Sequence, residues 1–427
     1  MMEHIVDITS LAFGGRGIGR IDGKVVFVPF TAPGDKARVE VVTEKKGFSE
    51  GALVEVVSPS PQRVSPSCPV FGACGGCALQ HISYEGQAEW KERIFEETLK
   101  RIGKVEGVEF GEPIKAANPW NYRGRAAFHV DKGAWGFFGG KSHSVIDIDE
   151  CPIVDPVVNR AFKGIKGALS GKKHGIYAVE VVGSPIDNRA VASFYVYEEK
   201  KVDWHGCLSG VEGLKGFEVR LSTERKGRGE RICAEGDTVL SYAVQGFTLK
   251  AGIGLFSQVN LTQNEQLVQK VIEYAGLSGT ETVVDLFSGV GNFTLPLSRG
   301  ARAAIGVESS VEAVEFAEEN ARINGTKSAS FHAAEAVAWL KQEIKNLEKT
   351  RPCVLVLDPP RGGGPDVVRM ISDARPERVV YVSCSPPTLA RDLSTLNACG
   401  YRVKRASFVD MFPQTYHIEC VACLELI

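Results

Sequence analysis

The stretch ETVVDLFSGVGNF, which runs from Glu281 to Phe293, decides the fold of this chain. Its apolar part, TVVDL, is short and does not alternate with polar residues, as expected of a strand that is buried on both faces. Gly289 and Gly291 come next and precede a helix-like segment. Glycines in such a turn let a ligand approach the backbone closely. The stretch therefore predicts a buried strand, a tight turn and a helix.

The chain after about residue 256 repeats this alternation. The strand-like runs AAIGVESS, PCVLVLDPP and RVVYVSCS are each followed by a helical pattern, and IECVACLELI predicts one more strand. Alternating strands and helices form a doubly wound parallel sheet, as in Rossmann-like domains. We therefore predict an α/β domain over residues 256–427, with ligands bound outside the carboxyl ends of its strands.

Two further units precede this domain. Residues 1–60 predict a small β-barrel of about five strands, a fold that often holds oligonucleotides, because apolar residues alternate and IDGK is a hairpin signal. Residues 61–255 predict a mixed α+β central domain that contains a cysteine cluster and an RNA-binding sheet. The part near 81–117 includes a charged helical segment, and it is a candidate for packing against the C-terminal domain.

The composition is that of an ordinary globular protein, with 44% apolar and 24% charged residues in 427. No apolar run reaches the roughly 18 residues of a membrane span. The first residues, MMEHIVDITS, lack the regions of a secretory signal. We therefore expect a cytoplasmic protein with no membrane association, and the sequence indicates no obligate protein partner. In a reducing compartment, eleven cysteines indicate metal binding or catalysis rather than disulfides.

The charge of the chain is unevenly distributed. A net charge of −2 does not by itself indicate a nucleic-acid-binding protein. Residues 160–231, however, contain 14 Lys and Arg against 9 Asp and Glu, and the densest part is RKGRGER, Arg225 to Arg231. A local basic patch can bind nucleic acid. A solvated hairpin tip accounts for the same charges equally well.

Functional side chains follow four of the predicted strands. Asp285, Glu308, Asp358 and Cys384 all lie at or just beyond strand ends. Because the carboxyl ends of parallel strands share one edge of the sheet, we expect these groups to converge there. An acid after the second strand, here Glu308, can accept hydrogen bonds from a ribose, and this combination is typical of S-adenosylmethionine-dependent methyltransferases. Any one of the acids taken alone is equally a candidate helix N-cap.

Cys384 lies in YVSCSPPTLARD, between a strand and a helix. The dipole at a helix N-terminus favours a thiolate, so we expect a reactive thiol rather than an inert buried cysteine. Beside a methyl donor, addition of a thiolate to C6 of uracil would make C5 nucleophilic. A base must then remove the C5 proton, and Glu419 in HIECVA is the candidate. Glu419 could instead be a surface carboxylate, but its strand is apolar.

Three cysteines, Cys68, Cys74 and Cys77, form a Cys-x5-Cys-x2-Cys array in the Gly-rich segment CPVFGACGGC. With a fourth thiolate they predict a site for zinc or for an iron–sulfur cluster, and the spacing does not choose between the two. Cys151, which is followed by proline, is the preferred fourth ligand. The weaker candidates are Cys207 and Cys233.

Several motifs together resemble a known family. YVSCSPPTLARD, HIECVA, LDPPR, DLFSGVGNF and FSQVN resemble the S-adenosylmethionine-dependent RNA uracil-5-methyltransferases, and the resemblance covers nearly the whole chain. The segment CPVFGACGGCALQHISYEGQ looks like the iron–sulfur branch, whose bacterial members modify 23S ribosomal RNA. The N-terminal barrel resembles the TRAM domain, which helps these enzymes to bind RNA.

The resemblance implies roles for individual residues. Cys384 matches the nucleophile and Glu419 the base. The positions around S-adenosylmethionine match Gln258, Phe287, Asn292, Glu308 and Asp358. The four ligands of a [4Fe–4S] cluster match Cys68, Cys74, Cys77 and Cys151, so the resemblance favours iron over zinc. The family usually has Asn after the nucleophile, where this chain has Ser385. We expect activity to survive this departure, with a change in how the turn or the uracil is held.

The sequence thus predicts methyl transfer from S-adenosylmethionine to C5 of a specific uridine in 23S rRNA, giving 5-methyluridine. The same reaction on tRNA is an alternative, because some cluster-bearing relatives act there. A non-catalytic RNA-binding protein is disfavoured because Cys384 and Glu308 are present. An electron-transfer protein would have to cycle redox states with a partner. Methylation of an adenine amine is disfavoured because Arg361 follows the prolines, where those enzymes have an aromatic residue.

Overall fold

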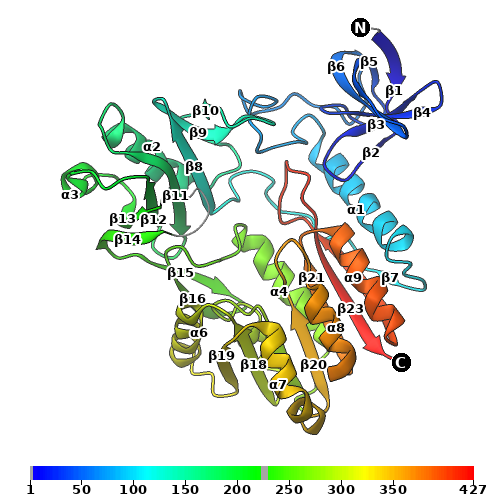
Figure 1. Cartoon of the computed structure of the whole chain (residues 1–427), viewed down its shortest axis with the longest axis vertical. Helices are drawn as coiled ribbons and strands as arrows, with labels where there is room; N and C mark the ends of the chain where they lie inside the picture. The colour runs from blue at the N-terminus through cyan, green and yellow to red at the C-terminus, as the bar shows by residue number, and fades with distance from the viewer. Residues whose placement is uncertain (1–2, 223–228) are drawn as a thin grey trace.

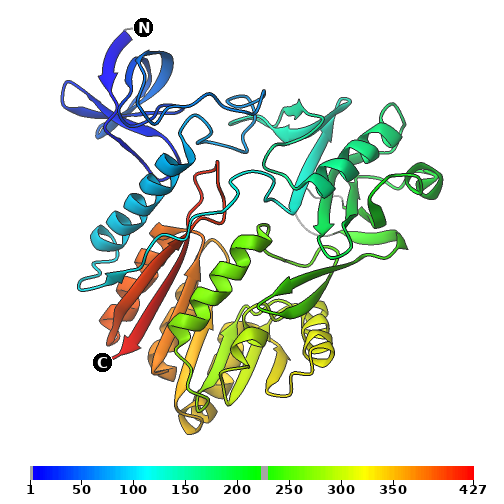
Figure 2. The same ribbon diagram turned by 180° about the vertical axis from the view of Figure 1, so that it is seen from behind.

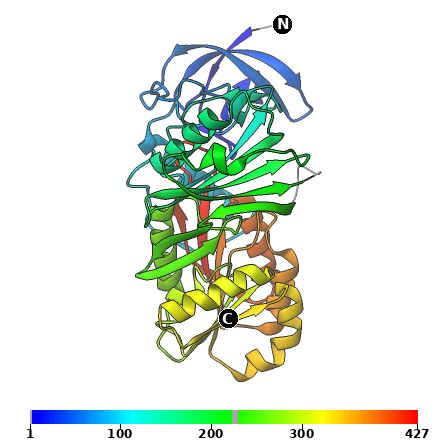
Figure 3. The same cartoon turned by 90° about the vertical axis from the view of Figure 1, so that its left-hand side faces the viewer.

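The chain folds into three tiers, with a barrel at the N-terminus, a sheet in the middle and a larger layered domain at the C-terminus (Figure 1; Figure 3). The computed structural model describes residues 3–222 and 229–427, so residues 225–228 of the predicted basic segment lie outside the described residues. Within the described part of the chain, no helix has the length and apolarity that crossing a bilayer requires.

An eight-stranded sheet forms the core of the C-terminal tier. In spatial order its strands are β19 (Ala329–Ala333), β18 (Ala303–Glu308), β17 (Thr282–Leu286), β20 (Cys353–Leu357), β21 (Arg378–Ser383), β23 (Glu419–Leu426), β22 (Tyr401–Val409) and β7 (Glu109–Phe110). Strand β23 runs antiparallel to both of its neighbours, and the other pairs are parallel. The predicted doubly wound α/β fold is thereby confirmed. The chain winds outward from β17 to β19 and returns at β20, which places the ligand-binding crevice beside β17.

Helices cover both faces of this sheet, with a separate apolar core on each face. They are α4 (Leu261–Ala275), α5 (Thr294–Leu297), α6 (Val311–Ile323), α7 (Ala336–Lys349), α8 (Pro365–Ala374) and α9 (Pro386–Ala398). Helices α4, α5 and α6 pack on one face, and α7, α8 and α9 pack on the other, together with α1 (Tyr84–Arg101). The hairpin of β15 (Val239–Val244) and β16 (Phe247–Gly252) falls in the range expected of the central domain, yet its apolar side chains pack against α4 and α6.

A seven-stranded sheet forms the middle tier. In spatial order its strands are β10 (Val145–Asp147), β9 (Ala134–Phe138), β8 (Arg125–Asp131), β11 (Ile176–Ser184), β12 (Arg189–Val196), β13 (Leu214–Leu221) and β14 (Glu230–Gly236). Helices α2 (Pro156–Leu169) and α3 (Trp204–Leu208) close an apolar core on one face. On the opposite face, the β15–β16 hairpin covers one end of the sheet, where Leu240 and Ile253 meet Val182 and Val191.

The N-terminal barrel has six strands where about five were predicted. They are β1 (Glu3–Asp7), β2 (Ser10–Leu11), β3 (Gly17–Ile21), β4 (Lys24–Val28), β5 (Lys36–Glu44) and β6 (Phe48–Ser58), in the spatial order β1-β5-β6-β4-β3-β2. The additional strand arises because the first segment breaks after Asp7, so that β1 pairs with β5 whereas β2 pairs with β3. Alternating residues such as Val26 and Val28 fill the core.

A buried ion pair joins α1 to the C-terminal tier. Lys91 Nζ lies 2.8 Å from Asp410 Oδ1 and donates to the carbonyl oxygen of Phe412 at 2.9 Å, and both charged side chains are buried. Gln87, about one turn earlier, donates to Gln414 Oε1 at 2.9 Å. These bonds hold the β22–β23 connection, residues 410–418, against α1 (Figure 2). Helix α1 thereby positions the segment that leads into β23.

Replacing Lys91 with methionine should destabilise the protein by about 3–5 kcal/mol, because the Asp410 carboxylate would stay buried without its partner. The matched control is Arg93→Met on the same helix, whose exposed pair with Glu89 should contribute at most about 1 kcal/mol. Urea unfolding should show a clearly lower midpoint for the Lys91 variant alone. Equal midpoints for the two variants would contradict this account of α1.

Candidate active site

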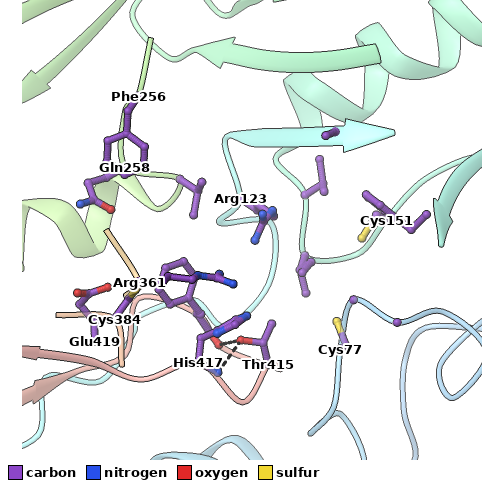
Figure 4. A pocket seen from close by; sticks show the side chains of 18 of the residues that line it. Cys77, Arg123, Cys151, Phe256, Gln258, Arg361, Cys384, Thr415, His417 and Glu419 are labelled. Atoms are coloured by element: carbon purple, nitrogen blue, oxygen red, sulfur yellow. Dashed lines mark hydrogen bonds between the residues drawn. The ribbon is translucent and has the colours of Figure 1, made fainter. Parts of the chain in front are cut away.

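A cavity of about 800 Å³ opens between the cysteine-rich segment after the barrel, the central sheet and the carboxyl ends of the C-terminal strands. Ten of the eleven side chains predicted for the site line it, namely Cys68, Cys74, Cys77, Cys151, Gln258, Phe287, Glu308, Asp358, Cys384 and Glu419. Figure 4 shows several of them around one space. The eleventh, Asn292, is not among the lining residues.

The turn after β17 presents its backbone to the cavity. Phe287 has a φ of 65°, in the left-handed region that residues other than glycine seldom adopt, and Gly289 follows at 54°. The Phe287 N–H donates to the carbonyl oxygen of Val307 at 2.9 Å, which holds the turn against β18. The Glu308 carboxylate accepts from the N–H of Gly289 at 3.2 Å and of Ser310 at 2.9 Å. The predicted ribose-binding acid is thus fixed beside the glycine turn.

The side chain of Asn292 connects this turn to α4. Its Nδ2 donates to Asn264 Oδ1 at 3.0 Å, and Asn264 Nδ2 donates to Asn292 Oδ1 at 2.8 Å. Asn264 is a buried residue of α4. The reciprocal amide pair therefore ties the turn to this helix, and in this structure Asn292 organises the cavity wall without facing the cavity.

Cys384 and Glu419 lie opposite each other where two neighbouring strands meet the cavity, Cys384 just after β21 and Glu419 at the start of β23. β21 pairs with β23 so that Ser383 faces Cys420. Cys384 follows Ser383, and Glu419 precedes Cys420. Because side chains alternate along extended chain, Cys384 and Glu419 point to the same side, into the cavity (Figure 4). The antiparallel insertion of β23 is therefore what brings these two groups together.

The expected thiolate character of Cys384 is wrong for the ligand-free cavity. Burial, followed by the nearby carboxyls of Glu419 and Asp358, raises the pKa of the Cys384 thiol to about 11, against the opposing effect of Arg361. The dipole of α9 does not reverse this, because Ser385 is the N-cap and the dipole acts mainly within the first turn. The thiol is consequently protonated at neutral pH when no ligand is present.

Two carboxyls share this part of the cavity. Burial raises the pKa of both Asp358 and Glu419, the charge of Asp358 raises the pKa of Glu419 further, and Arg361 lowers it. Two like charges in such proximity do not ionise together easily, so one carboxyl retains a proton. A positive charge that entered the cavity would lower the pKa of both carboxyls and of Cys384.

Other lining side chains were absent from the predicted set, among them Phe256, Arg123 and His417. Phe256 and His417 each stand two residues before a predicted site residue, and this spacing in extended chain puts side chains on one face. The sequence therefore carried a signal for both. Arg123 comes from the segment before β8, and no sequence pattern places it beside the catalytic strands. Burial lowers the pKa of His417 to about 4, so its ring is neutral at pH 7.

Four thiols face the cavity from its other side, those of Cys68, Cys74, Cys77 and Cys151. Burial chiefly, with a contribution from the neighbouring thiols, raises the pKa of Cys77 to about 12 and of Cys151 to about 11. Among residues 3–222 and 229–427, no three His, Cys, Asp or Glu side chains converge closely enough to hold one metal ion. The mutual effect of the thiols on their pKa values indicates that they lie near one another, but this arrangement does not by itself support either a zinc ion or a cluster. Cys207 and Cys233 pack against the core of the middle tier.

Comparison with known families identifies the C-terminal four-fifths of the chain. A family model described as tRNA (uracil-5-)-methyltransferase matches residues 84–427, beginning at the first residue of α1. The chain belongs to this family. A TRAM domain model also matches residues 4–54, within the barrel. The protein is therefore an S-adenosylmethionine-dependent RNA methyltransferase with an N-terminal TRAM domain, as the motifs predicted.

Relatives match the methyltransferase over its full length. An uncharacterized RNA methyltransferase of Caldanaerobacter subterraneus subsp. tengcongensis is 36% identical over 447 residues, covering 99% of this chain and 98% of the relative. The 23S rRNA (uracil(1939)-C(5))-methyltransferase RlmD of Methylococcus capsulatus is 32% identical, with 98% and 96% covered. The crystal structure of Pyrococcus abyssi tRNA (uracil-54, C5)-methyltransferase in complex with S-adenosyl-L-homocysteine has a TM-score of 0.77 and 26% identity, with 98% and 99% covered.

Alkylation of Cys384 in the ligand-free methyltransferase should be slow at pH 7 and should rise with pH toward a midpoint near 11, because only the thiolate reacts. At pH 9, Glu419→Gln should speed alkylation by roughly threefold to tenfold and Arg361→Gln should slow it by a similar factor. Iodoacetamide labelling followed by peptide mass spectrometry measures this site alone. Glu425→Gln, further along β23, serves as the control. Changes of the same sign in both test variants would rule out the electrostatic explanation.

Proposed function

We propose that this methyltransferase transfers a methyl group from S-adenosylmethionine to C5 of a uridine in 23S rRNA, with Cys384 as the nucleophile and Glu419 as the base. The observation that carries the proposal is the pairing of β21 with β23, which turns both side chains into one cavity beside Asp358. RNA binding alone would not require a thiol and a buried carboxyl in this relation. Around the donor we place Gln258, Phe287, Glu308 and Asp358, with Asn292 supporting the turn.

The proposed reaction begins when Cys384 Sγ bonds to C6 of the uracil and the electrons of the C5–C6 double bond move toward C5 and O4. S-adenosylmethionine supplies an activated methyl group, which C5 takes, leaving a neutral thioether. Glu419 then removes the C5 proton, the C5–C6 double bond forms again, and Cys384 leaves as a thiolate. The products are 5-methyluridine, S-adenosylhomocysteine and one proton, so atoms and charges balance.

Because these pKa values are raised in the ligand-free cavity, binding of the methyl donor can control when the reaction starts. Cys384 is protonated there, and the two carboxyls compete for one negative charge. A sulfonium bound beside Asp358 would favour the thiolate and the ionised carboxyls together. Cys384 then becomes a reactive thiolate when the methyl donor is bound. Without the donor it stays a protonated thiol, which reacts slowly.

For the substrate, 23S rRNA is the first candidate and tRNA the second. The Methylococcus relative named for 23S rRNA is 32% identical to this chain, against 26% for the Pyrococcus enzyme named for tRNA. The Pyrococcus structure nevertheless matches 98% of the chain, so the overall fold does not separate the two substrates. Loops and surface contacts must decide between them, because RNA is recognised largely through its shape and its single-stranded parts.

A transcript of 23S rRNA made with 5-fluorouridine should form a denaturation-resistant complex with the protein, because fluorine at C5 cannot leave as a proton does and the Cys384 adduct is trapped. Cys384→Ala should abolish this complex and methyl transfer, whereas Cys399→Ala, at the end of α9, should retain both. Glu419→Gln should accumulate the complex even with ordinary uridine. Gel electrophoresis and nucleoside mass spectrometry measure these outcomes. A complex with a tRNA transcript alone would shift the assignment to tRNA, and one that survives in Cys384→Ala would remove that residue from the mechanism.

We further propose that the four cavity thiols hold a [4Fe–4S] cluster. Their segment is attached to the middle tier by backbone hydrogen bonds, from Gly75 N–H to Phe138 O at 2.9 Å and from Gly140 N–H to Ala73 O at 3.0 Å. A cluster would add covalent links between this segment and Cys151, which precedes α2. Methyl transfer involves no electron transfer, so the group would fix the position of the two segments that line the cavity.

Protein purified without oxygen should contain about four iron atoms and about four acid-labile sulfides per chain. Cys77→Ser should lose both and lower the thermal midpoint, because the two segments lose their cross-link. Cys207→Ser, whose thiol packs in the middle tier, is the matched control and should retain the metal. Stoichiometric zinc without sulfide would contradict the cluster.

A further inference from the structure

We propose that the N-terminal barrel positions the β22–β23 connection and thereby sets the rate of methyl transfer, in addition to its contacts with RNA; this rests on the proposed function. The barrel does so through the turn between β2 and β3, residues 12–16. This turn meets Tyr416, which stands beside His417 and three residues before Glu419. Figure 1 shows the connection rising from β23 toward the barrel and α1. The proposed catalytic steps use neither the turn nor Tyr416.

The turn brings its backbone close to the connection. The Ala12 N–H donates to the carbonyl oxygen of Arg16 at 2.8 Å, and the Gly15 N–H donates to that of Ala12 at 3.0 Å. Gly15 has a φ of 78°, in the left-handed region that favours glycine. A Cβ atom at Gly15 would lie 3.1 Å from Ala78 Cβ and 3.3 Å from Tyr416 Cβ. The glycine therefore allows an approach that a side chain would push apart.

Apolar side chains on either side of the turn secure this contact. The rings of Phe13 and Tyr416 have centroids 6.0 Å apart and 89° between their planes, which is the edge-to-face arrangement that aromatic pairs favour. Phe13 also packs against the apolar core of the C-terminal tier. Leu11 forms a small buried cluster with Leu79, and Trp90 of α1 packs against it. The barrel is thus docked on the C-terminal tier at this turn.

The contact continues from Tyr416 into the cavity. The rings of Tyr416 and His417 have centroids 4.3 Å apart and 40° between their planes. His417 lines the cavity together with Thr415, and the His417 N–H donates to Thr415 Oγ1 at 3.3 Å (Figure 4). Glu419 follows two residues later and faces the same cavity. A displacement of Tyr416 would consequently reach the residues that face the proposed substrate.

Other supports act on an earlier part of the connection. The N–H groups of Ala78 and Leu79 donate to the carbonyl oxygen of Gln414 at 3.1 Å and 3.0 Å. The Tyr122 hydroxyl donates to the carbonyl oxygen of Pro413 at 2.8 Å. These bonds, like those from α1, hold the first residues of the connection. The barrel turn acts further along, nearer to β23.

This placement matters because methyl transfer depends on exact geometry. In the proposed reaction Glu419 must reach the C5 proton of a uracil whose C6 is bonded to Cys384. A misplacement of a catalytic group by 1 Å can cost about 100-fold in rate. Gly15, Phe13 and Tyr416 are therefore positioning residues, which act on the reaction through His417 and Glu419.

Gly15→Ala tests the contact, and Gly23→Ala in the β3–β4 turn is the matched control. The two glycines have φ values of 78° and 81°, but a Cβ at Gly23 meets none of the described atoms within 4 Å. With a 23S rRNA transcript, Gly15→Ala should lower kcat about 3- to 30-fold and leave the KM for RNA within about twofold, because the base is displaced while RNA contacts remain. Gly23→Ala should keep the wild-type kcat. Tyr416→Ala should lower kcat to a similar extent, and Tyr416→Phe, which keeps the ring, should restore it.

A second measurement does not depend on the reaction. Hydrogen–deuterium exchange of the ligand-free protein, read by mass spectrometry, reports on the peptide that covers residues 410–418. This peptide should exchange faster in Gly15→Ala than in the wild type and at the wild-type rate in Gly23→Ala. Circular dichroism melting shows whether Gly15→Ala folds. If it does not, Phe13→Leu replaces it with the same expectations.

An unchanged kcat would overturn the proposal, and so would unchanged exchange of the connection. Tyr416 is 37% exposed, so direct contact with RNA is the competing explanation. A raised KM with the wild-type kcat would support that explanation and refute ours. A wild-type protein that methylates no RNA and forms no adduct would refute the proposed reaction. The exchange measurement alone would then decide whether the barrel positions the connection.

Discussion

The arrangement of the catalytic cavity depends on one buried ion pair, that of Lys91 with Asp410. Taking both charges out of water is costly, and burial lowers the pKa of Lys91 against the opposing effect of Asp410. The hydrogen bond from Lys91 to the carbonyl oxygen of Phe412 offsets part of this cost of the pair. Its importance lies in position. It fixes the β22–β23 connection to α1, and this connection carries His417 and leads directly into β23. A helix from the N-terminal half of the chain thereby sets the position of the candidate base.

The pKa values in the cavity are raised because acidic side chains are buried there with too little positive charge to offset the loss of water. A thiol and two carboxyls are enclosed together, and the opposing effect of the Arg361 guanidinium on Cys384 and Glu419 is smaller than that of burial, so the neutral forms of all three acids are favoured. Such a site is complementary to a cation. The family uses S-adenosylmethionine, whose sulfonium is a cation. Its positive charge would balance the buried carboxyls and the thiol. The helix dipole, by contrast, has little effect on a thiol that precedes the N-cap.

The sequence was sufficient for the strands that line the candidate site because Asp285, Glu308, Asp358 and Cys384 each lie at or just beyond the end of a short apolar run, and parallel strands present their carboxyl ends at one edge. It was also sufficient for the barrel as a fold. It could not place Asn292, since the direction of a turn side chain depends on the partner that it finds, here Asn264 of α4. It also misjudged the pKa of Cys384, because burial and the charges of Asp358 and Glu419 come from other strands. The β15–β16 hairpin was assigned by its place in the chain, whereas packing against α4 and α6 decides where it lies.

The position of β23 in the chain has a consequence for folding during synthesis. It follows β21 and β22 in the chain, yet it lies between them in the sheet. A ribosome delivers the chain from its N-terminus at roughly 5–20 residues per second, so β21 and β22 emerge first and cannot become settled neighbours. Until β23 inserts, Cys384 has no Glu419 beside it. A nascent chain therefore lacks the arrangement of side chains on which the proposed reaction depends until β23 has inserted.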